Sequence, residues 1–151
     1  MIEGVELKKL EIQSDQRGHL MEILRSDDAV FTQFGQVYLT IVYPGVTKGW
    51  HLHRRKHDYT TCVRGMLKMV LYDGREESST KGEINVFFIG EYNPIMVHVP
   101  PEVHHALKCI SVCEALIVNC SSEVHDRDNP DEYGDAIPDS EVPYNWEFKF
   151  H

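Results

Sequence analysis

Short apolar runs alternate with turn residues along most of the chain from about residue 37 onward. The runs are rich in Val, Ile, Tyr and Thr, and they cover 37–42, 59–63, 67–72, 83–89, 95–99, 106–112 and 115–120. This composition, with Gly, Pro and Asp between most runs, is typical of the strands of a sandwich or barrel. Helical periodicity does not persist, although 26–35 could hold a short helical turn. The pattern therefore predicts an all-β protein.

The length of 151 residues suits one domain with a core of its own. We divide this single domain, 1–151, into an N-terminal segment (1–36), a strand-rich core (37–122) and a tail (123–151). The tail is acidic, rich in Asp and Pro, and aromatic near its end. We expect its aromatic side chains to pack on the barrel.

Charge and composition narrow the range of partners and compartments. A net charge of −9 argues against a protein that wraps nucleic acid or binds anionic lipid. No apolar run approaches the roughly 20 residues that cross a bilayer, and the N-terminus has no signal pattern. The four cysteines lie in apolar runs without a CxxC pair, which indicates buried free thiols. These features predict a cytoplasmic protein with no nucleic-acid or membrane partner.

The candidate chemistry lies in segment 45–65. His51 and His53 are separated by one residue, so their side chains would point to the same face of an extended strand. Two imidazoles on one face, followed by Asp58, can bind a metal or move protons. Trp50 would lie on the opposite face and pack in the sheet.

Written as spacing, this segment reads G-x5-H-x-H-x4-D-x6-G and resembles the first motif of the cupin superfamily. Residues 100–105 resemble the second motif, P-x-G-x-x-H, with Glu102 in place of Gly and His105 as the third histidine. The resemblance implies a cupin double-stranded β-helix, or jelly roll, with the site inside. It also implies an alternative in which a divalent metal is bound by His51, His53, Asp58 and His105.

Further segments resemble the dTDP-4-dehydrorhamnose 3,5-epimerase family. They are the D-x-R-G-x-x-x-E pattern of 15–22, the basic-Gly-apolar-His pattern of 48–51, the hairpin 73–82 and the stretch 143–146. The resemblance covers about residues 15–146. It implies an epimerase-like enzyme of polysaccharide biosynthesis that acts, without a cofactor and as a homodimer, on a dTDP-4-keto-6-deoxyhexose.

The resemblance also implies roles for individual residues. His51 and His53 would be catalytic, with His51 as the base, because imidazole can remove a proton next to a sugar ketone if the enolate oxygen is stabilised. The candidates for binding the nucleotide-sugar substrate are Arg17, Glu22, Gln36, Tyr38, Lys48, Asp58 and His105. Arginine and lysine suit its pyrophosphate because they donate charge-assisted hydrogen bonds.

Two positions depart from the epimerase pattern and leave more than one function open. The lysine of that family falls at Asp58 here, and its tyrosine falls near Ser122 or Glu123. The H-x-H run also resembles the dTDP-sugar 3,4-ketoisomerases, which makes ketoisomerisation an alternative. A metal-dependent cupin, either dioxygenase or isomerase, and a non-catalytic sugar-binding cupin stay open as well. Residues 54–56 are interpreted as a solvated basic loop, from which one side chain could reach a phosphate.

Overall fold

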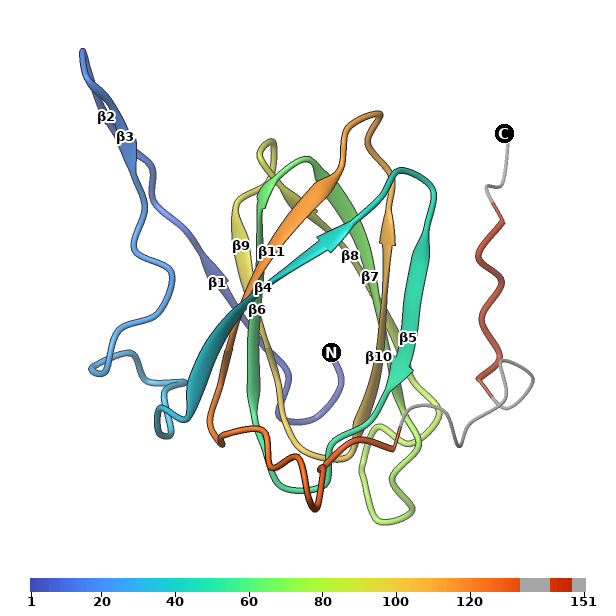
Figure 1. Ribbon diagram of the computed structural model, residues 1–151. Helices are drawn as coiled ribbons and strands as arrows, with labels where there is room; N and C mark the ends of the chain where they lie inside the picture. Colours follow the sequence, from blue (N-terminus) through green and yellow to red (C-terminus); the bar gives the residue numbers. More distant parts are fainter. Residues whose placement is uncertain (134–141, 148–151) are drawn as a thin grey trace.

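Two antiparallel sheets build the fold, seen in a computed structural model that describes residues 1–133 and 142–147. The strands are β1 (Glu6–Lys9), β2 (Gln13–Asp15), β3 (Gly18–Leu20), β4 (Gln36–Val42), β5 (Thr47–His51), β6 (Asp58–Arg64), β7 (Met66–Asp73), β8 (Ile84–Gly90), β9 (Ile95–Val99), β10 (Val103–Cys109) and β11 (Ala115–Ser121). One sheet has the order β1-β9-β6-β11-β4, the other β5-β10-β7-β8, and β2–β3 forms a separate hairpin. The two larger sheets face each other across the core (Figure 1).

Alternation along the strands fills the space between the sheets. The five-stranded sheet contributes Val97, Val99 and Ile117, and the four-stranded sheet contributes Leu67 and Met69 to the same buried cluster. Each of these side chains is at most 2% exposed. The predicted all-β jelly roll is therefore confirmed, and the predicted runs coincide with β4 and β6 to β11 with small shifts at their ends.

Two local predictions were wrong. Residues 26–30 form turns rather than a helical turn, because the Asp28 carboxylate accepts hydrogen bonds from the Arg25 N–H and from Lys8 Nζ and ties the segment to β1. Strand β5 ends at His51, so His53 is not on the same strand. The loop after β5 leaves the sheet because the carboxylate of Asp131 accepts hydrogen bonds from the backbone N–H groups of residues 54–56.

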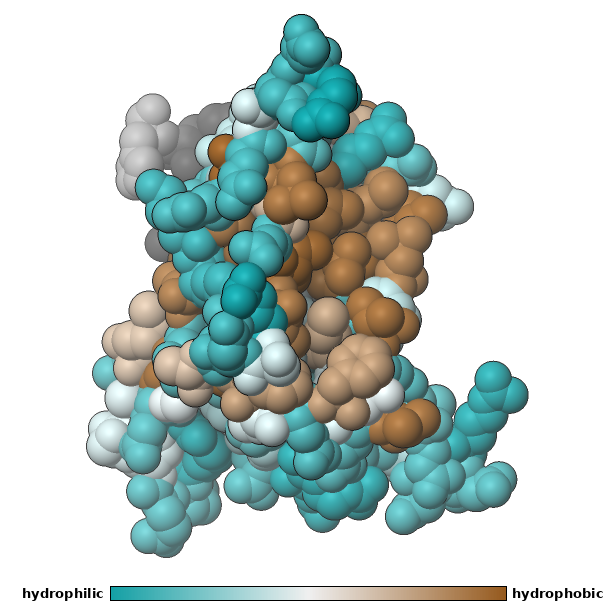
Figure 2. Space-filling view, turned by 90° about the vertical axis from the view of Figure 1, so that its left-hand side faces the viewer, coloured by the Kyte–Doolittle hydropathy of each residue, from teal (hydrophilic) through white to brown (hydrophobic). Residues whose placement is uncertain are grey.

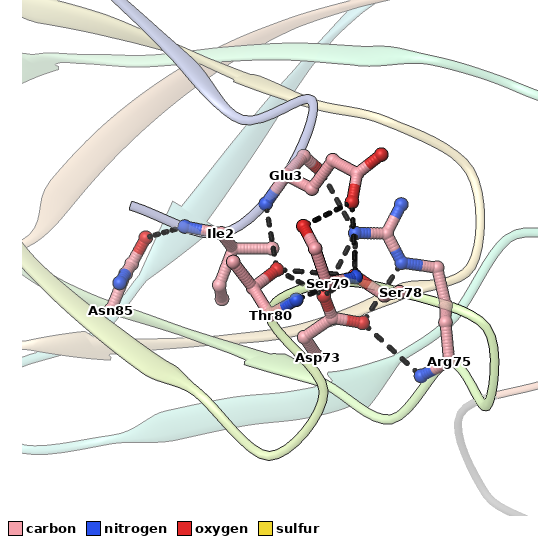
Figure 3. Close-up of polar contacts among 8 residues, drawn as sticks. All are labelled: Ile2, Glu3, Asp73, Arg75, Ser78, Ser79, Thr80 and Asn85. Carbon is pink, nitrogen blue, oxygen red and sulfur yellow. Dashed lines mark hydrogen bonds and ion pairs between the residues drawn. The ribbon is translucent and has the colours of Figure 1, made fainter.

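The β7–β8 hairpin holds the start of the chain through a buried carboxylate. Asp73 accepts hydrogen bonds from Arg75 Nε and Nη2, both at 2.8 Å, from Ser78 Oγ at 2.6 Å and from Thr80 Oγ1 at 2.7 Å. Arg75 Nη2 also donates to the carbonyl of Glu3 at 2.8 Å. Figure 3 shows these contacts converging on Asp73. The polar hairpin of the sequence is thus a structural clamp.

Residues 142–147 of the tail pack on the outer face of the four-stranded sheet. Trp146 lies against Trp50, with ring centroids 5.9 Å apart, and Tyr144 meets Trp146 edge to face. Trp50 therefore faces away from the interior, and the aromatic side chains of 142–147 contact it there. The remaining tail residues, 134–141 and 148–151, lie outside the described residues.

The outer face of the five-stranded sheet is apolar. Strand β4 ends this sheet, and it turns Val37, Leu39 and Ile41 outward with 54%, 56% and 44% of their surface exposed. Figure 2 shows broad apolar surface on this side of the molecule. The β2–β3 hairpin projects away from the barrel (Figure 1). Within the described residues, no helix has the length and apolar character needed to cross a membrane, and all four cysteines are free thiols.

Candidate functional site

A cavity of about 520 Å³ opens between the two sheets. Its volume lies in the range of ligand-binding clefts. It brings together these predicted residues: Gln36, Tyr38, Lys48, His51, His53, Asp58 and His105. Three strands of one sheet (β4, β6 and β11) and two of the other (β5 and β10) provide most of its wall, and segment 123–133 contributes His125 and Glu132.

Two predicted binding residues lie elsewhere in this chain. Arg17 sits at the turn of the β2–β3 hairpin, where it pairs with Asp15 and keeps 84% of its side chain exposed. Glu22 pairs with Arg25 and is also exposed. Neither side chain lines the cavity.

His51 is fixed beside His105 by the close approach of β5 and β10. The two residues are register partners, and their ring centroids are 5.8 Å apart. Gly49, with φ of +115°, allows this approach, because a Cβ at that position would lie 2.9 Å from the Ala106 Cα and from the His105 carbonyl oxygen. The glycine before the histidine therefore positions the candidate base.

His53 and His105 turn their Nε2 atoms toward Asp58. His53 Nδ1 donates to the carbonyl of Asp131 at 2.5 Å, and His105 Nδ1 faces the carbonyl of Val103 at 3.3 Å. Since a carbonyl oxygen only accepts, each ring carries a hydrogen on Nδ1. The Nε2 atoms then lie 3.3 Å and 3.8 Å from Asp58 Oδ2.

Burial sets the charge of this cluster. Burial lowers the pKa of His105 to about 3, so its ring is neutral at pH 7. Burial also opposes ionisation of Asp58, but its hydrogen bond with His53 and electrostatic attraction to the two histidine rings bring its pKa down to about 2. Asp58 Oδ1 is buried and has no hydrogen-bond partner among the residues described. Ligand atoms of His53, Asp58 and His105 lie within 4.8 Å of one another, so these three could hold a metal ion, in a group that does not include His51.

A polar row crosses the opposite wall of the cavity. Tyr38, Asn119 and Thr60 are register partners on β4, β11 and β6. Thr60 Oγ1 donates to Asn119 Oδ1 at 2.7 Å, and Asn119 Nδ2 donates to Tyr38 Oη at 2.7 Å. The phenol of Tyr38 therefore accepts from Asn119 and keeps its own hydrogen for the cavity. Burial and the negative charge of Asp58 raise the pKa of Tyr38 well above its usual range, so the phenol stays protonated.

The interpretation of 54–56 as a solvated loop was wrong for Lys56. Arg54 stacks on Tyr133 and Arg55 approaches Glu123, but Lys56 is only 4% exposed and lines the cavity. Sequence reasoning also missed Asn119 and Thr60, although each lies two residues from a core residue of its strand, Ile117 and Cys62, and so faces inward with it.

Comparisons with known proteins identify the family of the chain. A family model described as the polysaccharide biosynthesis C-terminal domain matches residues 13–133. The chain belongs to this family. It is 36% identical to the spore coat polysaccharide biosynthesis protein SpsL of Bacillus subtilis, over 99% of both chains. It is also 36% identical to the probable low-salt glycan biosynthesis epimerase Agl13 of Haloferax volcanii, over 99% of this chain and 97% of the relative.

Solved structures share the fold. A dTDP sugar isomerase from Desulfovibrio desulfuricans G20 superposes with a TM-score of 0.89 at 28% identity and covers 96% of this chain and 92% of its own. NovW, a 4-keto-6-deoxy sugar epimerase from Streptomyces spheroides, gives a TM-score of 0.79 at 28% identity, over 88% of this chain and 69% of its own. The predicted resemblance to sugar epimerases, and with it an epimerase-like enzyme of polysaccharide biosynthesis, is confirmed.

Proposed function

We propose that this chain is an epimerase or ketoisomerase of a nucleotide-linked 4-keto-6-deoxy sugar. The observation that carries the proposal is the placement of His51 on β5 and of the protonated phenol of Tyr38 on β4, in opposite walls of one cavity. The relatives support the substrate class, since two of them are described as a dTDP sugar isomerase and a 4-keto-6-deoxy sugar epimerase.

The chemistry follows from this arrangement. His51 removes the proton on the carbon next to the ketone, and the electron pair moves into the carbonyl to give an enolate. Tyr38 donates its proton from the opposite wall, which inverts that carbon. If the carbon proton instead returns to the former carbonyl carbon, and the hydroxyl on the deprotonated carbon passes its proton to the former carbonyl oxygen, the ketone and hydroxyl exchange places, as in a 3,4-ketoisomerase. The substrate ketone makes the C–H bond acidic, so this route needs no cofactor.

Lys48 supports binding of the nucleotide part. It lies on β5, is exposed and lines the cavity. An exposed ammonium at the edge of a cavity suits a pyrophosphate, which stays partly hydrated. The molecule is acidic overall, with a net charge of −9, so Lys48 provides a local positive charge to which an anionic ligand can bind.

The apolar outer face of the five-stranded sheet supports a second copy of the chain as a binding partner. Val37, Leu39 and Ile41 lie on an edge strand whose outer side is unpaired in the described chain. In such a dimer the projecting β2–β3 hairpin would extend toward the neighbouring copy, and Arg17 and Glu22 would reach the cavity of that copy. Light scattering should report a dimer, and Leu39→Glu should shift it to monomer. A cytoplasmic location belongs to the same proposal, and the free thiols support it.

The direct test is product analysis. Protein incubated with dTDP-4-keto-6-deoxyglucose should yield a new epimer or the 3-keto isomer by NMR, and His51→Asn should yield neither while still binding dTDP. Binding of the sugar nucleotide without any conversion would leave a sugar-binding cupin and overturn the proposal.

A metal-dependent enzyme is the second candidate. The converging Nε2 atoms of His53 and His105, each oriented by a carbonyl, and the unpartnered oxygen of Asp58 favour it. Metal analysis of protein purified without chelator tests it. Stoichiometric metal that is lost in His53→Ala, together with activity lost in chelator, would favour this candidate over the first.

A further inference from the structure

We propose that Lys56 is a catalytic residue that stabilises the enolate oxygen during the reaction. The inference rests on the proposed function and adds to it the cation that the oxyanion requires. Its basis is a buried lysine that lines the cavity, at a position for which the sequence alone predicts a solvated loop.

Within the described ranges, the partners of Lys56 do not explain its burial. Its side chain is 4% exposed, and lysine is rarely buried so deeply unless it is paired. The one ion pair of Lys56 within residues 1–133 and 142–147 joins its Nζ to Glu132 Oε1 at 4.0 Å. Glu132 is itself 52% exposed and also lies 3.6 Å from His125 Nδ1. Among the described residues, Lys56 Nζ makes no hydrogen bond, so its three donors can serve a ligand.

The backbone of Lys56 is held in place before any ligand binds. The carboxylate of Asp131 accepts the N–H groups of Arg54 and Arg55, each at 3.0 Å, and that of Lys56 at 3.3 Å. Burial opposes ionisation of Asp131, but these three backbone donors lower its pKa, so the anchor stays ionised. The backbone from which the Lys56 side chain extends is therefore fixed, which reduces the reorganisation needed when charge develops on the substrate.

The two cavity lysines suit different charges. Lys48 is exposed, where water screens its interaction with a permanently charged pyrophosphate. Lys56 is buried beside the cavity that holds His51, where the lower dielectric strengthens attraction to a charge that appears only during proton removal. Loss of Lys56 should therefore reduce turnover, and loss of Lys48 should reduce affinity.

The kinetic test compares Lys56→Met with Lys48→Met and Glu132→Gln. At saturating substrate, Lys56→Met should lower the rate of C–H exchange by about 100-fold or more, with dTDP affinity within about twofold of wild type. Lys48→Met should weaken dTDP binding instead. Ethylammonium should restore part of the turnover of Lys56→Ala, which a purely structural role would not allow. Equal losses in Lys56→Met and Glu132→Gln, or wild-type turnover in Lys56→Met, would overturn the inference.

A second measurement does not depend on turnover, so it separates this inference from the proposed function. Lys56 is labelled with an amine-reactive reagent and quantified by mass spectrometry, with dTDP or with dTDP-4-keto-6-deoxyglucose present. Stronger protection by the keto sugar supports contact with the sugar oxygen. Equal protection by both ligands would assign Lys56 to the pyrophosphate, and protection by neither would remove it from the site; either result overturns the inference. A wild-type protein that shows sugar-dependent protection but no exchange would contradict the proposed function alone.

Discussion

The Nδ1 atom of His53 donates a hydrogen bond to the backbone carbonyl of Asp131, 2.5 Å away and 78 positions later in the chain. The carboxylate of Asp131 binds the backbone N–H groups of residues 54–56. Asp131, in the segment that follows the last strand, therefore orients the candidate catalytic imidazole of His53 and fixes the loop that carries Lys56. The Tyr133 N–H, which donates to the Leu52 carbonyl at 3.0 Å, extends the same attachment.

Replacing Asp131 tests this attachment. Asp131→Ala leaves three backbone donors without their charged acceptor and should lower the free energy of unfolding by about 3 kcal/mol. Turnover should fall as well, because His53 and Lys56 lose their fixed positions. Urea denaturation and steady-state kinetics measure the two effects. Asp128→Ala, which removes an exposed carboxylate of the same segment, is the control and should change stability little.

Glu102 carries backbone strain next to the site. It is a non-glycine residue with φ of +64°, where the cupin pattern has glycine, and its N–H donates to the His53 carbonyl at 2.6 Å. Glycine relieves the left-handed strain and alanine does not, so Glu102→Gly should be more stable than Glu102→Ala by about 1 kcal/mol. Thermal unfolding of the two variants decides the matter. Equal stability would mean that the turn holds no such strain.

Asp73 should make stability depend on pH in the acid range. Burial opposes its ionisation, but hydrogen bonds from Arg75, Ser78 and Thr80 lower its pKa far below the usual value. The stabilisation is therefore complete above the unfolded pKa of about 3.9 and is lost as pH falls below it. Asp73→Asn should cost about 3 kcal/mol at pH 7, and the difference from wild type should shrink below about pH 4. Denaturation curves at pH 7, 5 and 3 would show a constant difference if the clamp were absent.

His98 should contribute pH dependence at a higher range. Burial, with a smaller effect from His57, lowers the pKa of His98 to about 4. The unfolded imidazole titrates near pH 6.5, so the stability is present above that value and is lost as pH falls toward 4. Between pH 7 and pH 5 this one group should cost wild type about 2 kcal/mol. His98→Phe, which can retain the stacking on Tyr59, should show a correspondingly smaller decrease by urea denaturation, and an equal decrease would contradict the assignment.

The sequence predicted the strands and the side chains that local alternation controls. Val97, Val99 and Ile117 follow the two-residue period into the core, and Trp50 follows it outward. Lys56 could not be predicted, because its burial depends on a carboxylate 75 positions away that binds the loop backbone. That long-range contact has no local pattern.

The departures at His53 and Arg17 also have long-range causes. His53 lies outside the predicted strand because the Asp131 carboxylate binds the backbone of the loop that follows His51. Arg17 has the sequence context of a binding residue, but it lies on a hairpin that projects from its own barrel (Figure 1). Its binding role stays a prediction, which in the proposed dimer would be exercised on the neighbouring copy. Asn119 and Thr60 could have been found, since both stand at inward positions of predicted strands.

The central claim is that His51 removes a proton next to the sugar ketone. The most direct measurement is deuterium incorporation into dTDP-4-keto-6-deoxyglucose in heavy water, followed by NMR at each carbon. Wild type should incorporate deuterium at C3, with or without C5, and folded His51→Gln should incorporate none while it binds dTDP within about twofold of wild type. Exchange by His51→Gln at the wild-type rate, or a wild-type protein that binds the sugar without exchange, would contradict this mechanism.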